Sequence, residues 1–129
     1  MNYGKLAELL LPNILKNTEY YEKLYPKREL ANGAMVTRFA PSPTSDNIHI
    51  GNLYVSFASE RLSHQSNGIF YLRIEDTDNK REVKGATNNI VTSLKDYGIN
   101  FDEGATIDGQ NGDYGDYYQS NRLKFIKHM

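Results

Sequence analysis

The chain has 129 residues and a formal net charge of −1, so it suits one domain with a modest core and has no global attraction to nucleic acid. It contains no cysteine, which excludes disulfides and cysteine-ligated zinc. Its apolar runs fall short of the roughly 20 residues of a membrane span, and its start lacks a signal peptide pattern, so we expect a soluble, cytoplasmic protein.

Residues 1–33 predict a helical extension ahead of the main domain. A leucine-rich stretch at 5–11 predicts one or two helical turns, which the following proline ends. Thr18 is a candidate N-cap for a second short helix that runs to Tyr25, where another proline stops it. No role follows from these residues, and we expect them to be separate from a domain at 34–129.

Two strands joined by a helix are predicted next. The apolar run 34–40 predicts a first core strand, and apolar residues at i and i+4 predict a helix over 51–65. Asn67 and the glycine after it turn the chain into a second strand at 69–75. Because the connection contains a helix, we expect parallel strands with a right-handed crossover, as in an α/β fold.

The following region predicts an amphipathic helix and then a loop. Apolar residues keep helical spacing from Val83 to Tyr97, and Gly98 follows as a C-cap. A short extended piece is predicted at 99–101. Four glycines and several aspartates then predict a long loop over 102–116.

The chain closes with a predicted helix. Ser120 is its candidate N-cap, and Leu123 and Ile126 form its apolar face. A helix so near the end has little to pack against, and the two predicted strands leave open sheet edges. We therefore expect the front part of a longer protein, with an incomplete parallel sheet flanked by helices.

Polar residues gather where the first predicted strand ends, at the edge where open α/β sheets bind ligands. A stiff Pro-Ser-Pro-Thr turn offers the hydroxyls of Ser42 and Thr44. A His-x-Gly at 49–51 then comes directly before the helix, whose free N–H groups favour an anion such as phosphate. From these residues alone, a merely rigid turn and an ordinary surface or capping histidine remain open alternatives.

The second strand ends in three carboxylates, those of Glu75, Asp76 and Asp78. Clustered carboxylates can bind a divalent cation, act as acid and base, or receive an ammonium group, but an aspartate before a helix is also ordinary capping chemistry. Arg38 and Arg73 lie on the predicted strands, where a buried charge needs a partner. Arg38 is therefore a candidate receptor for a carboxylate, by bidentate pairing.

Taken in order, these segments resemble the glutamyl-tRNA synthetases, a family of class I aminoacyl-tRNA synthetases. The resemblance rests on RFAPSPT, the His-Ile-Gly signature and LRIEDTD, with YGINFDEG and YYQSNRL further on. It runs from about Met35 to the end and implies a Rossmann-like catalytic domain. Enzymes of this family activate glutamate with ATP and magnesium to glutamyl-adenylate, and then transfer the glutamyl group to the terminal adenosine of tRNA.

The resemblance also implies roles for single residues. Arg38 would pair with a substrate carboxylate, and Glu75 would receive the α-ammonium group of glutamate. Ala40 and Ser42 would contact glutamate through backbone and hydroxyl. Magnesium would arrive with ATP, since no protein metal site is predicted. The ATP phosphates and adenosine would be held by Thr44, His49, Gly51 and Asn52. Of these, His49 and Gly51 would be the catalytic residues.

The sequence departs from the family's pattern in three places. Ser45 stands where glycine is usual, and Asn52 replaces the second histidine of the general class I signature. Four residues, 45–48, precede His49 where three are expected, so the loop carries an apparent insertion. The lysine-rich second signature loop and the anticodon-binding domain are also missing. We therefore expect the 129-residue chain alone to be inactive.

Other functions stay open at this point. A tRNA-modifying relative that attaches glutamate to a queuosine base shares these motifs, although it usually starts near the first strand and often has a cysteine-rich zinc site. Glutaminyl-tRNA synthetases commonly read PEPSG instead of PSPT. A degenerate, non-catalytic nucleotide-binding module is slightly favoured by the insertion before His49. The leading interpretation implies glutamate, ATP and tRNA(Glu) as partners, with tRNA(Gln) open, no membrane, and a monomer.

Overall fold

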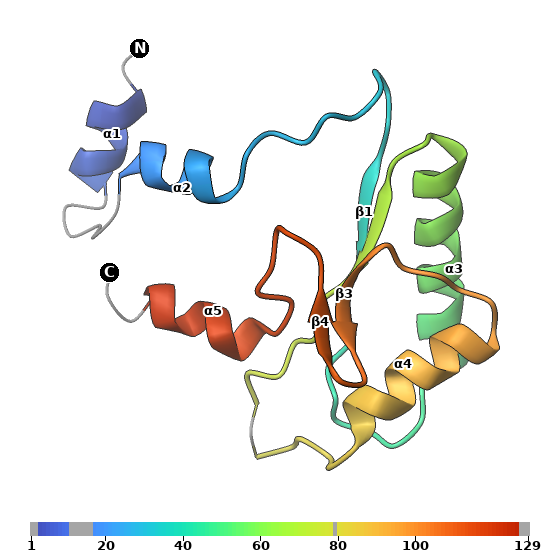
Figure 1. The fold of residues 1–129 in the computed structure, drawn as a ribbon. Coiled ribbons are helices and arrows are strands. Elements are labelled where there is room, and N and C mark those ends of the chain that lie inside the picture. The colour runs from blue at the N-terminus through green and yellow to red at the C-terminus, as the bar shows by residue number, and fades with distance from the viewer. Residues whose placement is uncertain (1–2, 11–16, 79, 127–129) are drawn as a thin grey trace.

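The computed structural model describes residues 3–10, 17–78 and 80–126 of the chain. None of the helices in this described part is long and apolar enough to cross a membrane. The elements follow in the order α1 (Tyr3–Leu10), α2 (Thr18–Leu24), β1 (Val36–Phe39), α3 (Ile50–Gln65), β2 (Ile69–Leu72), α4 (Ala86–Asp96), β3 (Glu103–Thr106), β4 (Gly109–Asn111) and α5 (Gln119–Ile126) (Figure 1).

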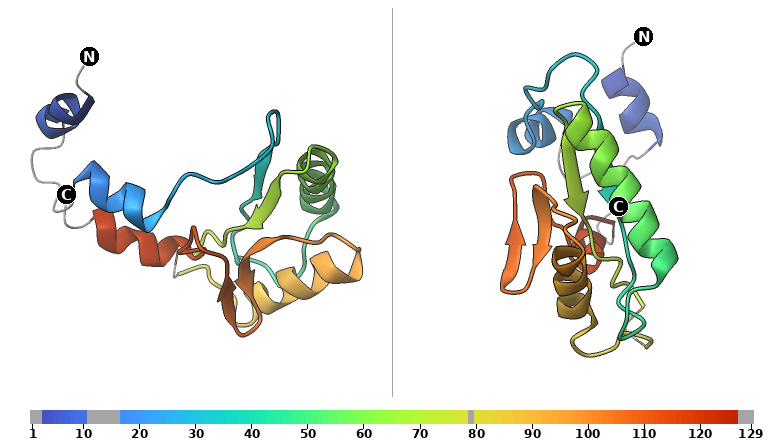
Figure 2. Two further views of the ribbon diagram at one scale, coloured as in Figure 1. Left: turned by 45° about the horizontal axis from the view of Figure 1, so that its top comes forward. Right: turned by 90° about the vertical axis from the view of Figure 1, so that its right-hand side faces the viewer.

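The strands form one sheet in the order β1-β2-β3-β4. β1 runs parallel to β2, with Val36 opposite Ile69 and Phe39 opposite Leu72. β3 is also parallel to β2, whereas β4 returns antiparallel to β3. The predicted parallel pair with an intervening helix is therefore confirmed, although both strands are shorter than expected. α1 and α2 lie on the opposite side of the molecule from α3 and α4 (Figures 1 and 2).

The core lies where the sheet meets α3 and α4. Phe70, Leu72 and Ile74 alternate along β2 and its continuation, and each is fully buried. They share one cluster with Leu53 of α3 and Leu94 of α4. Burying a large apolar side chain contributes about 1.5–3 kcal/mol, so this cluster fixes the two helices on the sheet.

The cap of α2 differs from the prediction. Asn17, not Thr18, is the N-cap residue, because the side-chain oxygen of Asn17 accepts a hydrogen bond from the N–H of Tyr20 at 3.0 Å. Thr18 is the first helical residue, and the helix ends at Leu24. Asparagine and threonine are both good N-caps, so residue preference alone does not separate position 17 from position 18.

The predicted loop over 102–116 is wrong in its first half, where residues 103–111 form the β3-β4 hairpin. β3 begins after the predicted extended piece at 99–101, not within it. Gly104 shows why a glycine-rich segment forms a strand here. Its φ is 139°, and a Cβ at this position would lie 2.3 Å from the carbonyl oxygen of Leu72. The glycine that suggested a loop instead allows β3 to approach β2 closely.

The fourth helix is shorter than predicted at its start. It begins at Ala86, so Val83 precedes it. At the other end Tyr97 is the C-cap residue, and Gly98 follows with φ 69°, the left-handed conformation typical of the residue after a helix. The predicted helix end is therefore confirmed to within one residue.

The fifth helix begins at Gln119, so Ser120 lies inside its first turn and is not the N-cap. Leu123 and Ile126, the predicted apolar face, belong to this helix, but their side chains lie outside the part of the chain that is described. The oxygens that cap α5 come instead from Asp76, at the end of β2.

Candidate functional site at the ends of β1 and β2

The turn after β1 is anchored by its prolines and presents its hydroxyls. Pro41 and Pro43 are buried, whereas Ser42 and Thr44 are exposed. The carbonyl oxygen of Pro41 accepts the N–H of Glu75 at 2.9 Å, which ties the turn to the end of β2. The carbonyl oxygen of Pro43 accepts an equally short bond from the loop before α4. This turn is therefore a fixed frame with two exposed hydroxyl groups.

His49 is the N-cap residue of α3. Its backbone is extended, with φ −77° and ψ 151°, and its exposed imidazole makes no capping hydrogen bond. Gly51 in the first turn is also exposed, with open space where a Cβ would stand. Asn52 beside it is exposed too. The free N–H groups of the first turn and the imidazole are therefore both accessible to an anion.

The loop with the apparent insertion, residues 45–48, is attached to the domain. Ser45 Oγ donates to the carbonyl oxygen of Asn47 at 2.9 Å, and the carbonyl oxygen of Asp46 accepts from the side-chain amide of Asn89 in α4 at 3.1 Å. Ile48 packs against the core. The loop is therefore braced at several points, and it leads through the N-cap residue His49 into α3.

Arg38 is exposed near the end of β1, and no carboxylate of the described residues pairs with it. Because it is exposed, it needs no internal partner, and its guanidinium is available to a ligand carboxylate. Ala40, directly after the strand, is half-buried.

Glu75 is held by Arg73 on the face opposite the core, as the strand alternation predicts. Arg73 donates from Nε at 2.9 Å and from Nη2 at 2.6 Å, both to Oε1 of Glu75. Only 16% of the Arg73 side chain and 27% of the Glu75 side chain are exposed. Oε2 of Glu75 accepts no hydrogen bond from the described residues. One carboxylate oxygen is thus fixed and the other is open to a cation.

The two aspartates that follow have structural partners. Oδ1 of Asp76 accepts the N–H of Ser120 at 2.7 Å, and Oδ2 accepts the Ser120 hydroxyl at 2.6 Å. Asp76 therefore does cap a helix, as the capping alternative predicted. The helix that it caps is α5, however, and not α4, which is the next helix in the chain. Asp78 pairs with Arg81 at 2.6 Å, and this hydrogen bond lowers the pKa of Asp78. Among the described residues, no three His, Cys, Asp or Glu side chains form a group that could hold a metal ion.

A second cluster, absent from the sequence prediction, joins the residues ahead of β1 to the hairpin. Arg28 donates two hydrogen bonds to the carboxylate of Glu103, with Nη2 at 2.6 Å from Oε2. The Tyr117 hydroxyl donates to the same carboxylate at 2.6 Å. The bond from Arg28 lowers the pKa of Glu103, and burial raises the pKa of Tyr117 to about 12 with help from Glu103.

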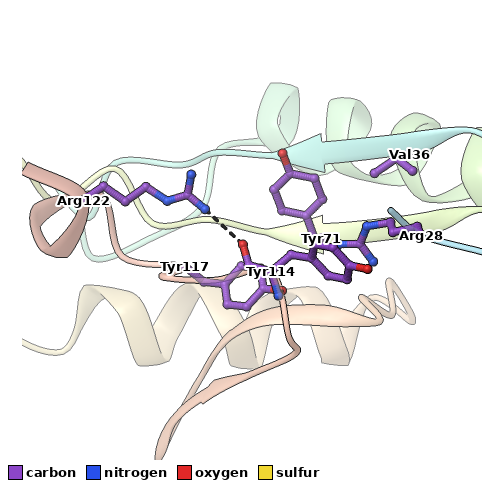
Figure 3. A pocket seen from close by; sticks show the side chains of 6 residues that line it. All are labelled: Arg28, Val36, Tyr71, Tyr114, Tyr117 and Arg122. Atoms are coloured by element: carbon purple, nitrogen blue, oxygen red, sulfur yellow. Dashed lines mark hydrogen bonds between the residues drawn. The ribbon is translucent and has the colours of Figure 1, made fainter. Parts of the chain in front are cut away.

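A cavity of about 260 Å³ opens beside this cluster. Figure 3 shows that Arg122 reaches across its edge, where Nη2 donates to the carbonyl oxygen of Tyr114 at 3.3 Å. Arg28 and Glu103 are 75 residues apart, so no local pattern pointed to this cluster. Six side chains line the cavity: Arg28, Val36, Tyr71, Tyr114, Tyr117 and Arg122.

Residues 34–129 match the family described as "tRNA synthetases class I (E and Q), catalytic domain". The chain belongs to this family. The resemblance found in the sequence motifs is thereby confirmed, and so is the α/β fold of a class I catalytic domain.

Relatives of this chain are glutamate–tRNA ligases. It is 58% identical over 128 residues to that of Acetivibrio thermocellus and 53% identical over 128 residues to that of Clostridium perfringens, in each case over 98% of this chain and 23% of the relative. A crystal structure of the glutamate-tRNA synthetase from Elizabethkingia anophelis matches with a TM-score of 0.63 at 35% identity, over 70% of this chain and 18% of that one. The chain thus spans less than a quarter of the length of these relatives.

The region ahead of the family domain is also shared with some relatives. An alignment over 98% of this chain necessarily includes most of residues 1–33, which the family match does not cover. The match to the glutamate–tRNA ligase of Thermus thermophilus, by contrast, covers 69% of this chain at 43% identity.

Proposed function

We propose that the protein to which this chain belongs is a cytoplasmic, monomeric glutamate–tRNA ligase. A carboxylate of glutamate attacks the α-phosphorus of ATP, pyrophosphate leaves, and glutamyl-adenylate forms. A hydroxyl of the terminal adenosine of tRNA(Glu) then attacks the activated carbonyl, and AMP leaves. Charging of tRNA(Gln) stays open as a second activity. The family match from residue 34 supports a catalytic domain at 34–129 that follows an extension at 1–33.

One observation carries the proposal at the level of geometry. Glu75 has one oxygen fixed by Arg73 and the other open, at the edge where Arg38 is exposed without a partner among the described residues. An amino acid carries an ammonium group and carboxylates, which these two charges complement. We assign the ammonium to Glu75 and a carboxylate to Arg38, and we assign further contacts to the Ala40 backbone and the Ser42 hydroxyl.

ATP is assigned to the start of α3. The exposed imidazole of His49 and the free N–H groups beside Gly51 suit phosphate oxygens. We assign further contacts with ATP to Thr44 and Asn52, which are also exposed. Attack on phosphorus needs mainly positioning and neutralisation of charge, so no protein nucleophile is required. Mg²⁺ would arrive with ATP, held chiefly by the phosphate oxygens.

The decisive experiment is glutamate-dependent ATP–pyrophosphate exchange by the full-length protein, with and without tRNA. Exchange that requires tRNA supports a glutamate–tRNA ligase. Exchange without tRNA favours the enzyme that modifies queuosine. Absence of exchange in both conditions favours the degenerate binding module, and the loop at 45–48 would then be tested first by deletion of one residue.

A further inference from the structure

We propose that Arg28, which precedes the family domain, is a positioning residue for Glu75. It acts through Glu103 and Tyr117, which hold the segment that borders the end of β2. The proposal rests on the function proposed above, in which Glu75 receives the ammonium group of glutamate. It gives residues ahead of the family domain a part in substrate binding.

The first link is the contact between Arg28 and Glu103. Two parallel hydrogen bonds join guanidinium and carboxylate, and only 18% and 12% of the two side chains are exposed. The guanidinium carbon also lies 3.6 Å from the centre of the Tyr114 ring. Figure 3 shows Arg28 and Tyr114 side by side at the cavity. A bidentate, half-buried pair stacked on an aromatic ring fixes geometry far better than an exposed ion pair.

Neighbouring residues strengthen this attachment. The rings of Tyr25 and Tyr114 stack with centroids 6.4 Å apart. The Tyr25 hydroxyl donates to the carbonyl oxygen of Gly115 at 3.0 Å, and the Tyr114 hydroxyl donates back to the carbonyl oxygen of Pro26 at 2.7 Å. The segment 25–28 is therefore bound at several points to the turn after the hairpin.

The second link runs from Glu103 to Tyr117. The Tyr117 side chain is 1% exposed, and its hydroxyl donates to Oε2 of Glu103 while it accepts the N–H of Tyr114 at 3.2 Å. A Cβ on Gly112 would lie 2.5 Å from this hydroxyl oxygen and 2.9 Å from Cβ of Glu103. The ring of Tyr117 therefore has little space in which to move while Glu103 is in place.

The third link joins the backbone of Tyr117 to the end of β2. The N–H of Ile74 donates to the carbonyl oxygen of Tyr117, and the carbonyl oxygen of Ile74 accepts the N–H of Gln119, both at 2.9 Å. Ile74 and Tyr118 form a parallel bridge. Segment 117–120 thus extends the sheet beside β2 at the level of the candidate site.

Glu75 lies between two anchored neighbours. Ile74 is held by the backbone of segment 117–120, and both oxygens of Asp76 are bound by Ser120. Loss of Arg28 would leave Glu103 without its cation and free the ring of Tyr117. Segment 117–120 would then shift relative to Glu75, and the open oxygen of Glu75 would be less well placed for an ammonium group.

The test uses the full-length protein with Arg28→Ala and Arg28→Lys. In ATP–pyrophosphate exchange with tRNA, we expect Arg28→Ala to raise the KM for glutamate on the order of tenfold, with the KM for ATP unchanged. Arg28→Lys keeps the charge but not the bidentate fork, so we expect an intermediate value. Arg28→Ala combined with Glu103→Gln should add little to the single change, because both break the same link.

Arg81→Ala is the matched control, since it removes an exposed arginine whose side chain is 75% accessible and which pairs with Asp78 near the same strand end. We expect it to leave the KM for glutamate unchanged. If Arg28→Ala lowers the melting temperature but leaves that KM unchanged, Arg28 is only a stabilising residue and the proposal is wrong.

Two further outcomes remain separable. If wild-type protein shows no glutamate-dependent exchange, the proposed function fails, whatever Arg28 does. If Arg28→Ala does not fold, Tyr117→Phe keeps the ring and removes the hydroxyl that donates to Glu103 and accepts from the N–H of Tyr114. This variant should still raise the KM for glutamate by about threefold. An unchanged KM in Tyr117→Phe would then overturn the proposal.

Discussion

Arg73 directs both of its hydrogen bonds to a single oxygen of Glu75, at 2.9 and 2.6 Å, and leaves the second oxygen without a partner among the described residues. A carboxylate held in this way is oriented, yet its second oxygen can still accept another cation. The pair lies on the sheet face opposite Leu72 and Ile74, which are fully buried. The core thus fixes the strand, and the strand presents the open oxygen.

Glu75→Gln keeps the shape of the side chain and removes its charge. If Glu75 receives the ammonium group, the KM for glutamate in ATP–pyrophosphate exchange by the full-length protein should rise about 10- to 100-fold. This rise corresponds to the loss of a hydrogen bond between charged groups, which contributes roughly 1.5–3 kcal/mol. Asp78→Asn is the control, because Asp78 lies in the same loop but pairs with exposed Arg81. An equal effect of both changes would contradict the assignment.

Arg38→Ala should weaken the use of glutamate and not of ATP. Arg38 is exposed and unpaired among the described residues, so its removal strands no internal carboxylate and should leave the melting temperature nearly unchanged. We expect the KM for glutamate to rise about 10- to 100-fold, and Arg38→Lys to recover part of it, because lysine cannot pair in bidentate fashion. Unaltered glutamate dependence in both variants would refute this role.

His49→Ala should slow the formation of the adenylate. We expect the exchange rate to fall about 10- to 100-fold while the KM for glutamate changes little, since the imidazole is assigned to phosphate. His64→Ala is the matched control on the same helix. His64 lies in the last turn of α3, at the end opposite His49, and its Nε2 is 3.0 Å from Oδ2 of Asp102. We therefore expect His64→Ala to change stability and not the exchange rate. A normal rate in His49→Ala would make His49 an ordinary capping residue.

Local sequence patterns were sufficient to predict where Arg73, Glu75 and His49 lie on their strand and helix. Alternation along 69–75 placed Arg73 and Glu75 on one face, and the apolar spacing over 51–65 placed His49 at a helix start. These features depend on residues a few positions apart, where the periods of strand and helix apply. The stiff turn with its outward hydroxyls has the same origin.

Long-range partners were not accessible in this way. Asp76 caps a helix at Ser120, 44 residues away, and Arg28 finds Glu103 across 75 residues. Nothing in the local pattern of either residue identifies its partner, because the topology of the sheet brings the segments together. The hairpin was missed for a different reason, since Gly104 has the same local signature in a loop and in a strand that approaches its neighbour closely.

Gly104→Ala should be far more destabilising than Gly109→Ala, although their φ angles are 139° and 143°. Both changes strain the backbone, at roughly 1–3 kcal/mol. Only at Gly104 would the new Cβ also meet main chain, 2.3 Å from the carbonyl oxygen of Leu72, whereas Gly109 has open space. We expect Gly104→Ala to cost in total about 4 kcal/mol or more, measured by denaturant unfolding of the 129-residue chain. Equal costs would show that β3 does not approach β2 as described.

The Glu103–Tyr117 pair should make stability depend on pH at both extremes. The pKa of Glu103 is lowered from its ordinary value of 4.5 by the hydrogen bond from Arg28, so its contribution is complete above 4.5 and is lost as pH falls through the lowered pKa. The pKa of Tyr117 is raised from 10.0 to about 12, so the folded state keeps the proton longer and stability falls between these values as pH rises.

Denaturant unfolding of wild type, Glu103→Gln and Tyr117→Phe across this range measures both effects. The difference in unfolding free energy between wild type and Glu103→Gln should be constant near neutrality and shrink below pH 4.5, because the wild type then loses the charge that the variant never had. Tyr117→Phe should show a smaller alkaline fall than the wild type above pH 10, because burial also raises the pKa of Tyr118, which the variant keeps. Parallel curves at both extremes would show that neither group is held in the hydrogen-bonded arrangement that joins residue 28 to the hairpin.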